Sequence, residues 1–139
     1  TLGLYKSKAK NILNTCRLLL DKYNGDIPTT RKELIQFPGV GRKTANVVLS
    51  IAHDFDAIAV DTHVFRVSNR IGLAYAKNVR KTEEQLMEVI PKKEWSAAHH
   101  WLIWHGRKIC KARKPLCNEC FLIQYCLYYK KMTNPEYSG

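Results

Sequence analysis

The chain has 139 residues, 45% of them hydrophobic and 25% charged, so it fits about one globular domain and is not a disordered chain. Its formal net charge of +11 at pH 7 favours a polyanionic partner, with nucleic acid as the first candidate and a merely basic domain as the alternative. No stretch approaches the roughly 20 apolar residues of a membrane-spanning helix.

Apolar residues recur at helical spacing almost throughout, with no alternating strand of useful length and no internal repeat. Asn24-Gly25 ends the first expected helix, in which Cys16 is expected to lie in the core, and Thr30 with Glu33 forms a capping box for the second. In the third expected helix, Ala52 is among the residues expected to point inward. The expected helices cover residues 6–23, 31–36, 42–52, 62–71, a segment that begins near Thr82 and ends before Pro91, and 95–107.

Val60-Asp61 is the best internal boundary, because a short apolar segment precedes it. We expect two helical lobes, residues 1–60 and 61–139, with Asp61 at their junction. The tail over residues 110–126 is too irregular for a long helix and too rich in cysteine for a plain loop.

A tight turn, Gly39-Val40-Gly41, joins the second and third expected helices. Glycine tolerates positive φ and lacks the Cβ atom that would block a ligand's close approach. Backbone N–H groups of this turn and of the following residues, Arg42 and Thr44 among them, can then converge on a phosphate. Such a contact fixes the position of a nucleic acid without reading its bases, and an ordinary interhelical turn is the alternative.

Lys43 follows the turn at the start of a helix, where its charge opposes the helix dipole. A nucleophilic lysine must lose its proton, and burial or nearby positive potential favours the neutral amine. The position suits a reactive amine and, equally, a solvated lysine that binds phosphate beside Arg42. Asp61, 18 residues further on, also suits two roles: stabilising positive charge in a reaction, and capping the helix that begins near Thr62.

Four of the five cysteines crowd together with the spacing C-x6-C-x2-C-x5-C. Four thiolates hold either a tetrahedral zinc ion or a [4Fe–4S] cluster, but zinc sites more often have two C-x-x-C pairs and this chain has one. The spacing favours iron–sulfur over zinc, with disulfides as a third reading. The first loop between the cysteines carries three cations that could grip phosphates or simply keep the chain soluble. The cysteines are Cys110, Cys117, Cys120 and Cys126, and the cations are Lys111, Arg113 and Lys114.

The segment LIQFPGVGRKTANVVLSIA resembles the helix-hairpin-helix element of the endonuclease III family of base-excision DNA glycosylases. The resemblance continues through AVDTHVFRVSNR and HHWLIWHGRKIC to the cysteines. It implies an all-α, helix-hairpin-helix glycosylase fold of two lobes, with a C-terminal loop that binds a [4Fe–4S] cluster. It also implies that Lys43 is the Schiff-base lysine and Asp61 the essential aspartate, and that further helices precede Thr1 in a full-length protein.

The implied activity is that of a DNA glycosylase with abasic-site lyase activity on oxidised pyrimidines. Lys43 would attack the sugar of a flipped nucleotide, expel the base and leave an imine, and β-elimination would then break the strand. The expected partner is double-stranded DNA with damaged bases or abasic sites. The protein is expected to bind it as a monomer and to have no membrane partner. The expected location is the cytoplasm and nucleoid of a bacterium, or the nucleus or mitochondrion of a eukaryote. His63 is expected to line the active site.

Two rival readings remain open. One is a mismatch-specific glycosylase for adenine or thymine, although the adenine branch usually lacks a lysine at the position of Lys43. The other is a non-catalytic helix-hairpin-helix module. We expect Trp101 and Trp104 to pack in the core, with stacking on bases as the alternative. Arg66 and Arg70, which share a helix face, are expected either to reach phosphate or to be solvated.

Overall fold

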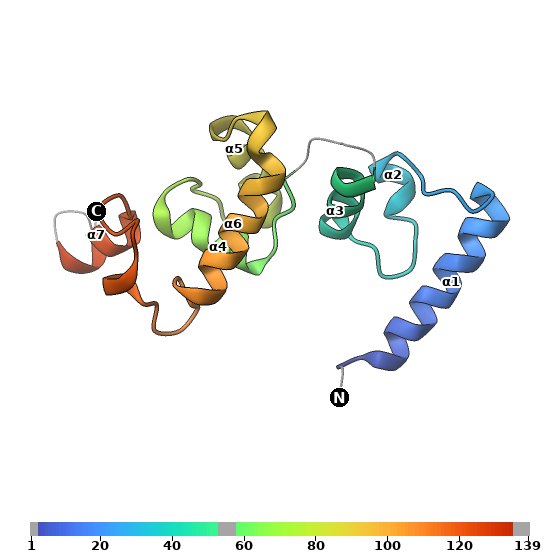
Figure 1. Ribbon diagram of the computed structural model, residues 1–139, viewed down its shortest axis with the longest axis horizontal. Helices are drawn as coiled ribbons and strands as arrows, with labels where there is room; N and C mark the ends of the chain where they lie inside the picture. Colours follow the sequence, from blue (N-terminus) through green and yellow to red (C-terminus); the bar gives the residue numbers. More distant parts are fainter. Residues whose placement is uncertain (1–2, 53–57, 135–139) are drawn as a thin grey trace. The chain divides into compact units, whose positions relative to one another are not determined.

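The structure is a computed structural model that describes residues 3–52 and 58–134 (Figure 1). Every regular element in these two stretches is a helix, so the expected all-α fold is confirmed. None of the described helices is long and apolar enough to cross a membrane. The helices are α1 (Tyr5–Tyr23), α2 (Arg31–Leu34), α3 (Arg42–Ala52), α4 (Thr62–Ile71), α5 (Val79–Val89), the 3-10 helix η1 (Lys92–Glu94), α6 (Trp95–Lys108), the 3-10 helix η2 (Cys117–Glu119) and α7 (Leu127–Thr133).

The chain divides into two compact units, Thr1–Phe55 and Asp56–Gly139, and each is described by itself. The boundary proposed between residues 60 and 61 stays a prediction.

The expected local signals set several helix ends. Asn24 ends α1 in the left-handed conformation at φ 51°, and the Thr30 hydroxyl accepts a hydrogen bond from the Glu33 N–H at the start of α2. α5 begins at Val79, so Thr82 lies near its start as expected, and the Asn78 side chain caps this start by accepting a bond from the Lys81 N–H.

The first unit is built around a pair of neighbouring helices, α2 and α3, seen in cyan and green in Figure 1. Leu34, Ala45 and Leu49 are buried and pack together, with Val40 and Val48 against them.

Two residues expected inside this unit lie outside its core. No residue of α1 is buried, so Cys16 lies outside the core, and Ala52 at the end of α3 is exposed as well. Helical spacing identifies an apolar face, but a face is buried only where another element covers it. Two described contacts join α1 to its own unit: the Tyr23 ring lies 5.6 Å from the Phe37 ring, and the Asn11 side chain lies against Gly39.

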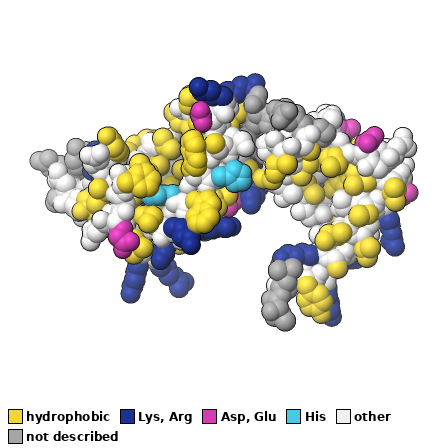
Figure 2. Space-filling view, in the orientation of Figure 1, with side chains coloured by type: hydrophobic (Ala, Val, Ile, Leu, Met, Phe, Trp, Pro, Cys, Tyr) yellow, Lys and Arg dark blue, Asp and Glu magenta, His cyan; other side chains and the backbone are white. Residues whose placement is uncertain are grey.

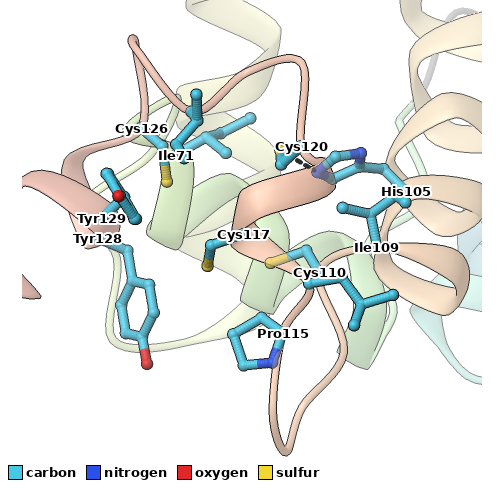
Figure 3. A pocket seen from close by; sticks show the side chains of 12 residues that line it. Ile71, His105, Ile109, Cys110, Pro115, Cys117, Cys120, Cys126, Tyr128 and Tyr129 are labelled. Atoms are coloured by element: carbon cyan, nitrogen blue, oxygen red, sulfur yellow. Dashed lines mark hydrogen bonds between the residues drawn. The ribbon is translucent and has the colours of Figure 1, made fainter.

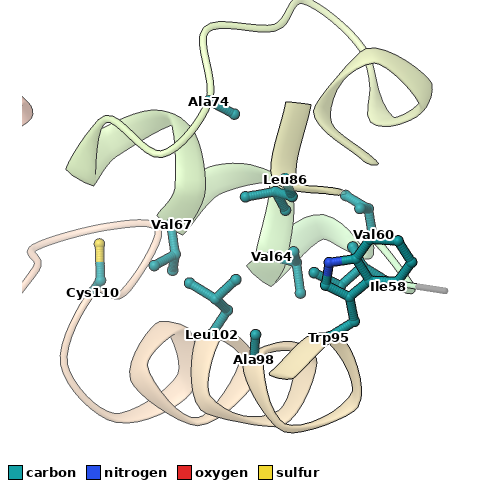
Figure 4. Packing of buried hydrophobic residues seen from close by; sticks show 10 residues of the cluster. All are labelled: Ile58, Val60, Val64, Val67, Ala74, Leu86, Trp95, Ala98, Leu102 and Cys110. Atoms are coloured by element: carbon teal, nitrogen blue, oxygen red, sulfur yellow. The ribbon is translucent and has the colours of Figure 1, made fainter. Parts of the chain in front are cut away.

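In the second unit, α4 packs against both α5 and α6 around one apolar core (Figure 4). Gly106 lets α4 and α6 approach closely, because a Cβ atom there would lie 3.0 Å from Cγ2 of Val67 and 3.1 Å from Cβ of His63. The buried members of this core are Ile58, Val60, Val64, Val67, Ala74, Leu86, Trp95, Ala98, Leu102 and Cys110.

The expectation that Trp101 and Trp104 pack in the core is wrong: their exposed fractions are 61% and 62%. The buried face of α6 runs from Trp95, whose indole N–H donates to the Ile90 carbonyl at 2.8 Å, towards Gly106. Both exposed tryptophans lie off that face. Figure 2 shows other hydrophobic side chains that also reach the surface of the molecule.

Candidate functional site

The turn between α2 and α3 is shaped by its first glycine. Gly39 has φ +77°, which L-residues rarely adopt, and a Cβ atom there would meet the Asn11 side chain at 2.4 Å. Gly41 has neither constraint, because its φ is not in the left-handed region and no atom lies within 4 Å of the position its Cβ would take. The fold therefore requires glycine at 39, while at 41 the absent side chain leaves open space.

A polar contact that sequence reasoning missed ties α2 to α3. Asn46 is fully buried, and its side-chain oxygen accepts a bond of 2.7 Å from Nε of Arg31. A polar residue between Ala45 and Leu49, on the inward face of a helix, was the available signal, because a buried amide needs a partner. The contact holds the two helices that carry the turn.

The cation Lys43 stands in the first turn of α3, directly after the glycine turn. Its side chain is exposed, as is that of Thr44, whereas Arg42 is partly buried. The Gly41 carbonyl accepts from the Ala45 N–H at 2.9 Å, so the helix begins at the turn itself. The N-terminus of a helix is a general anion-binding arrangement, and at the N-terminus of α3 it lies beside the cations Arg42 and Lys43.

Asp61 caps the start of α4, which confirms one of the two roles expected for it. Its Oδ1 atom accepts hydrogen bonds from the N–H groups of His63 at 2.8 Å and Val64 at 2.9 Å. These two bonds fix the orientation of the carboxylate. Lys43 belongs to the first unit and Asp61 to the second, so their meeting in one active site stays a prediction.

His63 is partly buried beside α6. Its Nδ1 atom lies 3.2 Å from Nη2 of Arg66, and the same Nη2 donates to the carbonyls of Gly106 at 2.9 Å and Cys110 at 3.1 Å. The expected role of His63 in lining an active site remains a prediction.

The four clustered cysteines line one apolar pocket in the second unit (Figure 3). Cys110 and Cys126 are buried, and Cys117 and Cys120 are partly buried. None of the chain's five cysteines forms a disulfide, so that third reading of the cluster is wrong. The pocket gathers cysteine sulfurs from the segment after α6, from η2 and the residue that follows it, and from the residue before α7.

The surroundings of Cys117 disfavour a bare thiolate in this pocket. Burial raises the pKa of the Cys117 thiol, the neighbouring cysteines raise it further, and Arg70 lowers it. Thiolates packed this closely become stable when a metal replaces their protons. No three His, Cys, Asp or Glu side chains in the described stretches are placed to hold one metal ion.

Two side chains on neighbouring helices reach the sulfurs. Nη1 of Arg70 lies 3.5 Å from Sγ of Cys110, and Nε2 of His105, whose pKa is lowered by burial, lies 3.5 Å from Sγ of Cys120. Arg66 and Arg70 both donate to main-chain carbonyls of the cysteine segment or the end of α6. Plain solvation of these arginines is therefore wrong, since sequence spacing could not show which segment faces α4, and phosphate contact by either one stays a prediction.

The loop of residues 111–116, here called the basic loop, joins the first two cysteines. It is closed by a bond of 3.0 Å from the Leu116 N–H to the Ile109 carbonyl. Lys111, Arg113 and Lys114 are all exposed. The loop is therefore a constrained segment with three cations on its surface, and its contact with DNA stays a prediction.

Two family models match the chain. Residues 1–92 match the model described as "HhH-GPD superfamily base excision DNA repair protein", and residues 110–126 match the "Iron-sulfur binding domain of endonuclease III". The second match begins and ends on the first and last cysteines of the pocket. It confirms the expected [4Fe–4S] cofactor over the zinc alternative.

The chain is similar to bacterial proteins named endonuclease III. It is 53% identical over 132 residues to that of Escherichia coli (strain K12), covering 95% of this chain and 63% of the relative. It is 50% identical over 127 residues to that of Bacillus subtilis (strain 168), covering 91% and 58%. The chain thus spans less than two thirds of the length of these relatives.

Solved structures agree on the fold. A trapped endonuclease III–DNA covalent intermediate superposes with a TM-score of 0.86 at 52% identity, covering 95% of this chain and 62% of that one. A thermostable thymine-DNA glycosylase gives a TM-score of 0.80 at 28% identity, with coverage of 93% and 61%. The helix-hairpin-helix glycosylase fold expected from the sequence is confirmed.

Proposed function

Since the chain belongs to the HhH-GPD superfamily of base excision DNA repair proteins, we propose that it is a DNA glycosylase and abasic-site lyase acting on oxidised pyrimidines in duplex DNA. The observation that carries the proposal is an exposed Lys43 in the first turn of α3, directly after the glycine turn. A relative with 52% identity has been trapped as a covalent complex with DNA, which supports an amine that bonds to the sugar.

Lys43 is the proposed nucleophile. Its neutral amine attacks C1′ of the damaged nucleotide, the C1′–N bond breaks, and the base leaves with a proton. Transfer of the second amine proton to the ring oxygen O4′ and breakage of the C1′–O4′ bond open the sugar ring and give an imine between Nζ and C1′. The imine acidifies the C2′ proton, and removal of that proton expels the 3′ phosphate by β-elimination. One lysine thus serves both base removal and strand cleavage.

Asp61 is the proposed electrostatic partner in this reaction. A carboxylate held by two backbone N–H groups has a fixed direction, so it loses little freedom when positive charge develops on the sugar. It can also take part in the proton transfers around the amine. The residue would then combine the structural role of a helix cap with a catalytic one.

Double-stranded DNA is the proposed partner, bound by a monomer through its phosphates. The open space at Gly41 and the cation Arg42 that follows it suit close approach of a phosphate to the turn. The three exposed cations of the basic loop supply a second basic surface, and the chain's net charge of +11 agrees with such a partner. The relatives reported above are bacterial, which supports the bacterial nucleoid as the location.

Cys110, Cys117, Cys120 and Cys126 are the proposed ligands of the [4Fe–4S] cluster. When bound, the cluster supplies a cross-link between segments that are separated in the chain. It would hold the basic loop against the end of α6. The chain's own contribution is the apolar pocket and the side chains that orient the sulfurs.

A thymine-mismatch glycosylase is the second candidate, because a thymine-DNA glycosylase shares the fold with a TM-score of 0.80. The experiment compares labelled duplexes that carry one thymine glycol, one abasic site, one G·T mismatch or one A·G mismatch. We expect cleavage of the first two and none of the mismatched duplexes, with loss of cleavage but retained DNA binding in Lys43→Ala. Endonuclease III of Escherichia coli serves as the positive control. Base removal only from a mismatch would favour a mismatch glycosylase, and binding without turnover would indicate a non-catalytic module.

A further inference from the structure

Arg70 makes a set of contacts that the proposed function does not use. Its Nη1 atom lies 2.7 Å from the Lys111 carbonyl and 3.5 Å from Sγ of Cys110. Its Nη2 atom lies 3.1 Å from the Ala112 carbonyl. The guanidinium carbon stands 4.6 Å from the centre of the Tyr128 ring, within range of a cation–π contact.

These contacts fix the guanidinium plane. Two carbonyls accept from its two ends and one aromatic ring lies beside it, so the group has little freedom to turn away from Cys110. The backbone carbonyl of the same residue also lies 3.5 Å from Sγ of Cys126. Arg70 therefore touches both the first and the last cysteine of the pocket.

We propose that Arg70 is a positioning residue of the iron–sulfur site, which holds Cys110 and the start of the basic loop and raises the reduction potential of the bound cluster. Reduction by one electron, with no proton taken up, makes the cluster more negative by one charge. A cation that donates an N–H to a ligand sulfur stabilises that reduced form more than the oxidised form. Hydrogen bonds to ligand atoms tune metal sites in this way generally.

Arg66 lies one helical turn earlier on the same face of α4 but does not share the contact that Arg70 makes with Sγ of Cys110 in the described hydrogen bonds. Its described hydrogen bonds go to the carbonyls of Thr62, Gly106 and Cys110 and to the His63 ring. Of the two arginines, Arg70 is the one whose described bonds include a cysteine sulfur. The two arginines thus differ in what they offer to the cluster, although they lie on one face.

The proposal rests on the iron–sulfur cofactor and not on glycosylase activity, so either can fail without the other. The test is the one-electron reduction potential of the purified holo-protein at an electrode, with Arg70→Met compared with the wild type. Iron and sulfide analysis shows that equal cluster content is being compared. Arg80→Met is the matched control, because it removes the same charge from α5, where Arg80 pairs with Glu84 on the surface.

We expect the potential of Arg70→Met to be more negative than that of the wild type, and that of Arg80→Met to be unchanged. We also expect the Fe–S(Cys) stretching bands to shift in Arg70→Met alone, a change that general loosening of the fold would not confine to this variant. If Arg70→Met does not retain its cluster, Arg70→Gln, which keeps a donor but not the charge, takes its place with the same expectation. A wild-type potential in either variant at full cluster content would overturn the proposal.

Discussion

Replacing Gly39 by alanine tests how far the turn depends on its left-handed residue. An L-residue held at φ +77° costs roughly 1–2 kcal/mol. The added methyl group would also press on Nδ2 of Asn11 at 2.4 Å, and this side chain would have to move. Alanine also restricts the conformations of the unfolded chain. This restriction stabilises a protein by about 0.4–1 kcal/mol only where alanine can adopt the native backbone conformation without strain, and at Gly39 it cannot. We expect Gly39→Ala to lower the free energy of unfolding by about 1–2 kcal/mol.

Gly41→Ala is the matched control two residues further on. Its methyl group meets nothing within 4 Å and its backbone is not left-handed. The loss of a favourable residue at the helix start and the restriction of the unfolded chain oppose one another, so we expect a net change within about 0.5 kcal/mol. The methyl group would nevertheless stand where a phosphate is proposed to approach. Loss of one charge-assisted hydrogen bond, about 1.5 kcal/mol, would weaken DNA binding about tenfold.

The two variants are compared by urea unfolding followed by circular dichroism and by fluorescence anisotropy with a labelled duplex at fixed salt. The expected pattern is that Gly39→Ala loses stability and Gly41→Ala loses affinity. Wild-type affinity in Gly41→Ala would refute the phosphate-binding role of the turn. Greater destabilisation by Gly41→Ala than by Gly39→Ala would refute the structural role assigned to the left-handed backbone at Gly39.

Three further predictions concern the second unit. Leu86→Ala removes a fully buried core side chain and should lower the free energy of unfolding, measured with urea, by about 2–5 kcal/mol. Val89→Ala, at a position 56% exposed on the same helix, should lower it far less, and equal losses would contradict the core assignment. Changing the three cations of the basic loop to alanine should flatten the slope of log DNA affinity against log salt concentration. The expected change is about 0.9 for each phosphate that the loop no longer neutralises. An unchanged slope would mean that the loop only keeps the chain soluble. Removing the cluster with a chelator should raise hydrogen exchange in residues 110–126 but not in α3, and unchanged exchange in the cysteine segment would contradict a structural role for the cluster.

Local chemistry made much of the fold predictable from the sequence. Helix ends depend on residues close in the chain, so the signals at Asn24, Thr30 and Asp61 could be recognised without any tertiary contact. The cysteine spacing could indicate a metal cofactor for a similar reason, because four cysteines so close together in the chain have few structural uses other than metal binding.

The residues predicted wrongly depend on contacts between distant segments. Cys16, Trp101 and Trp104 lie on helices with apolar residues on more than one side, and the pattern does not say which side another element covers. Arg70 could not be placed beside a cysteine 40 residues away, because only the packing of α4 against the cysteine segment brings them together.

The most direct test of the proposed chemistry is to find where the chain bonds to DNA. The protein is incubated with a duplex that holds one abasic site, borohydride is added to reduce any imine, and the digested adduct is mapped by mass spectrometry. We predict that the sugar remnant is attached to Nζ of Lys43 and that Lys43→Ala forms no adduct. An adduct on another amine, or none from a holo-protein that binds the same duplex, would contradict the role of Lys43 as the nucleophile.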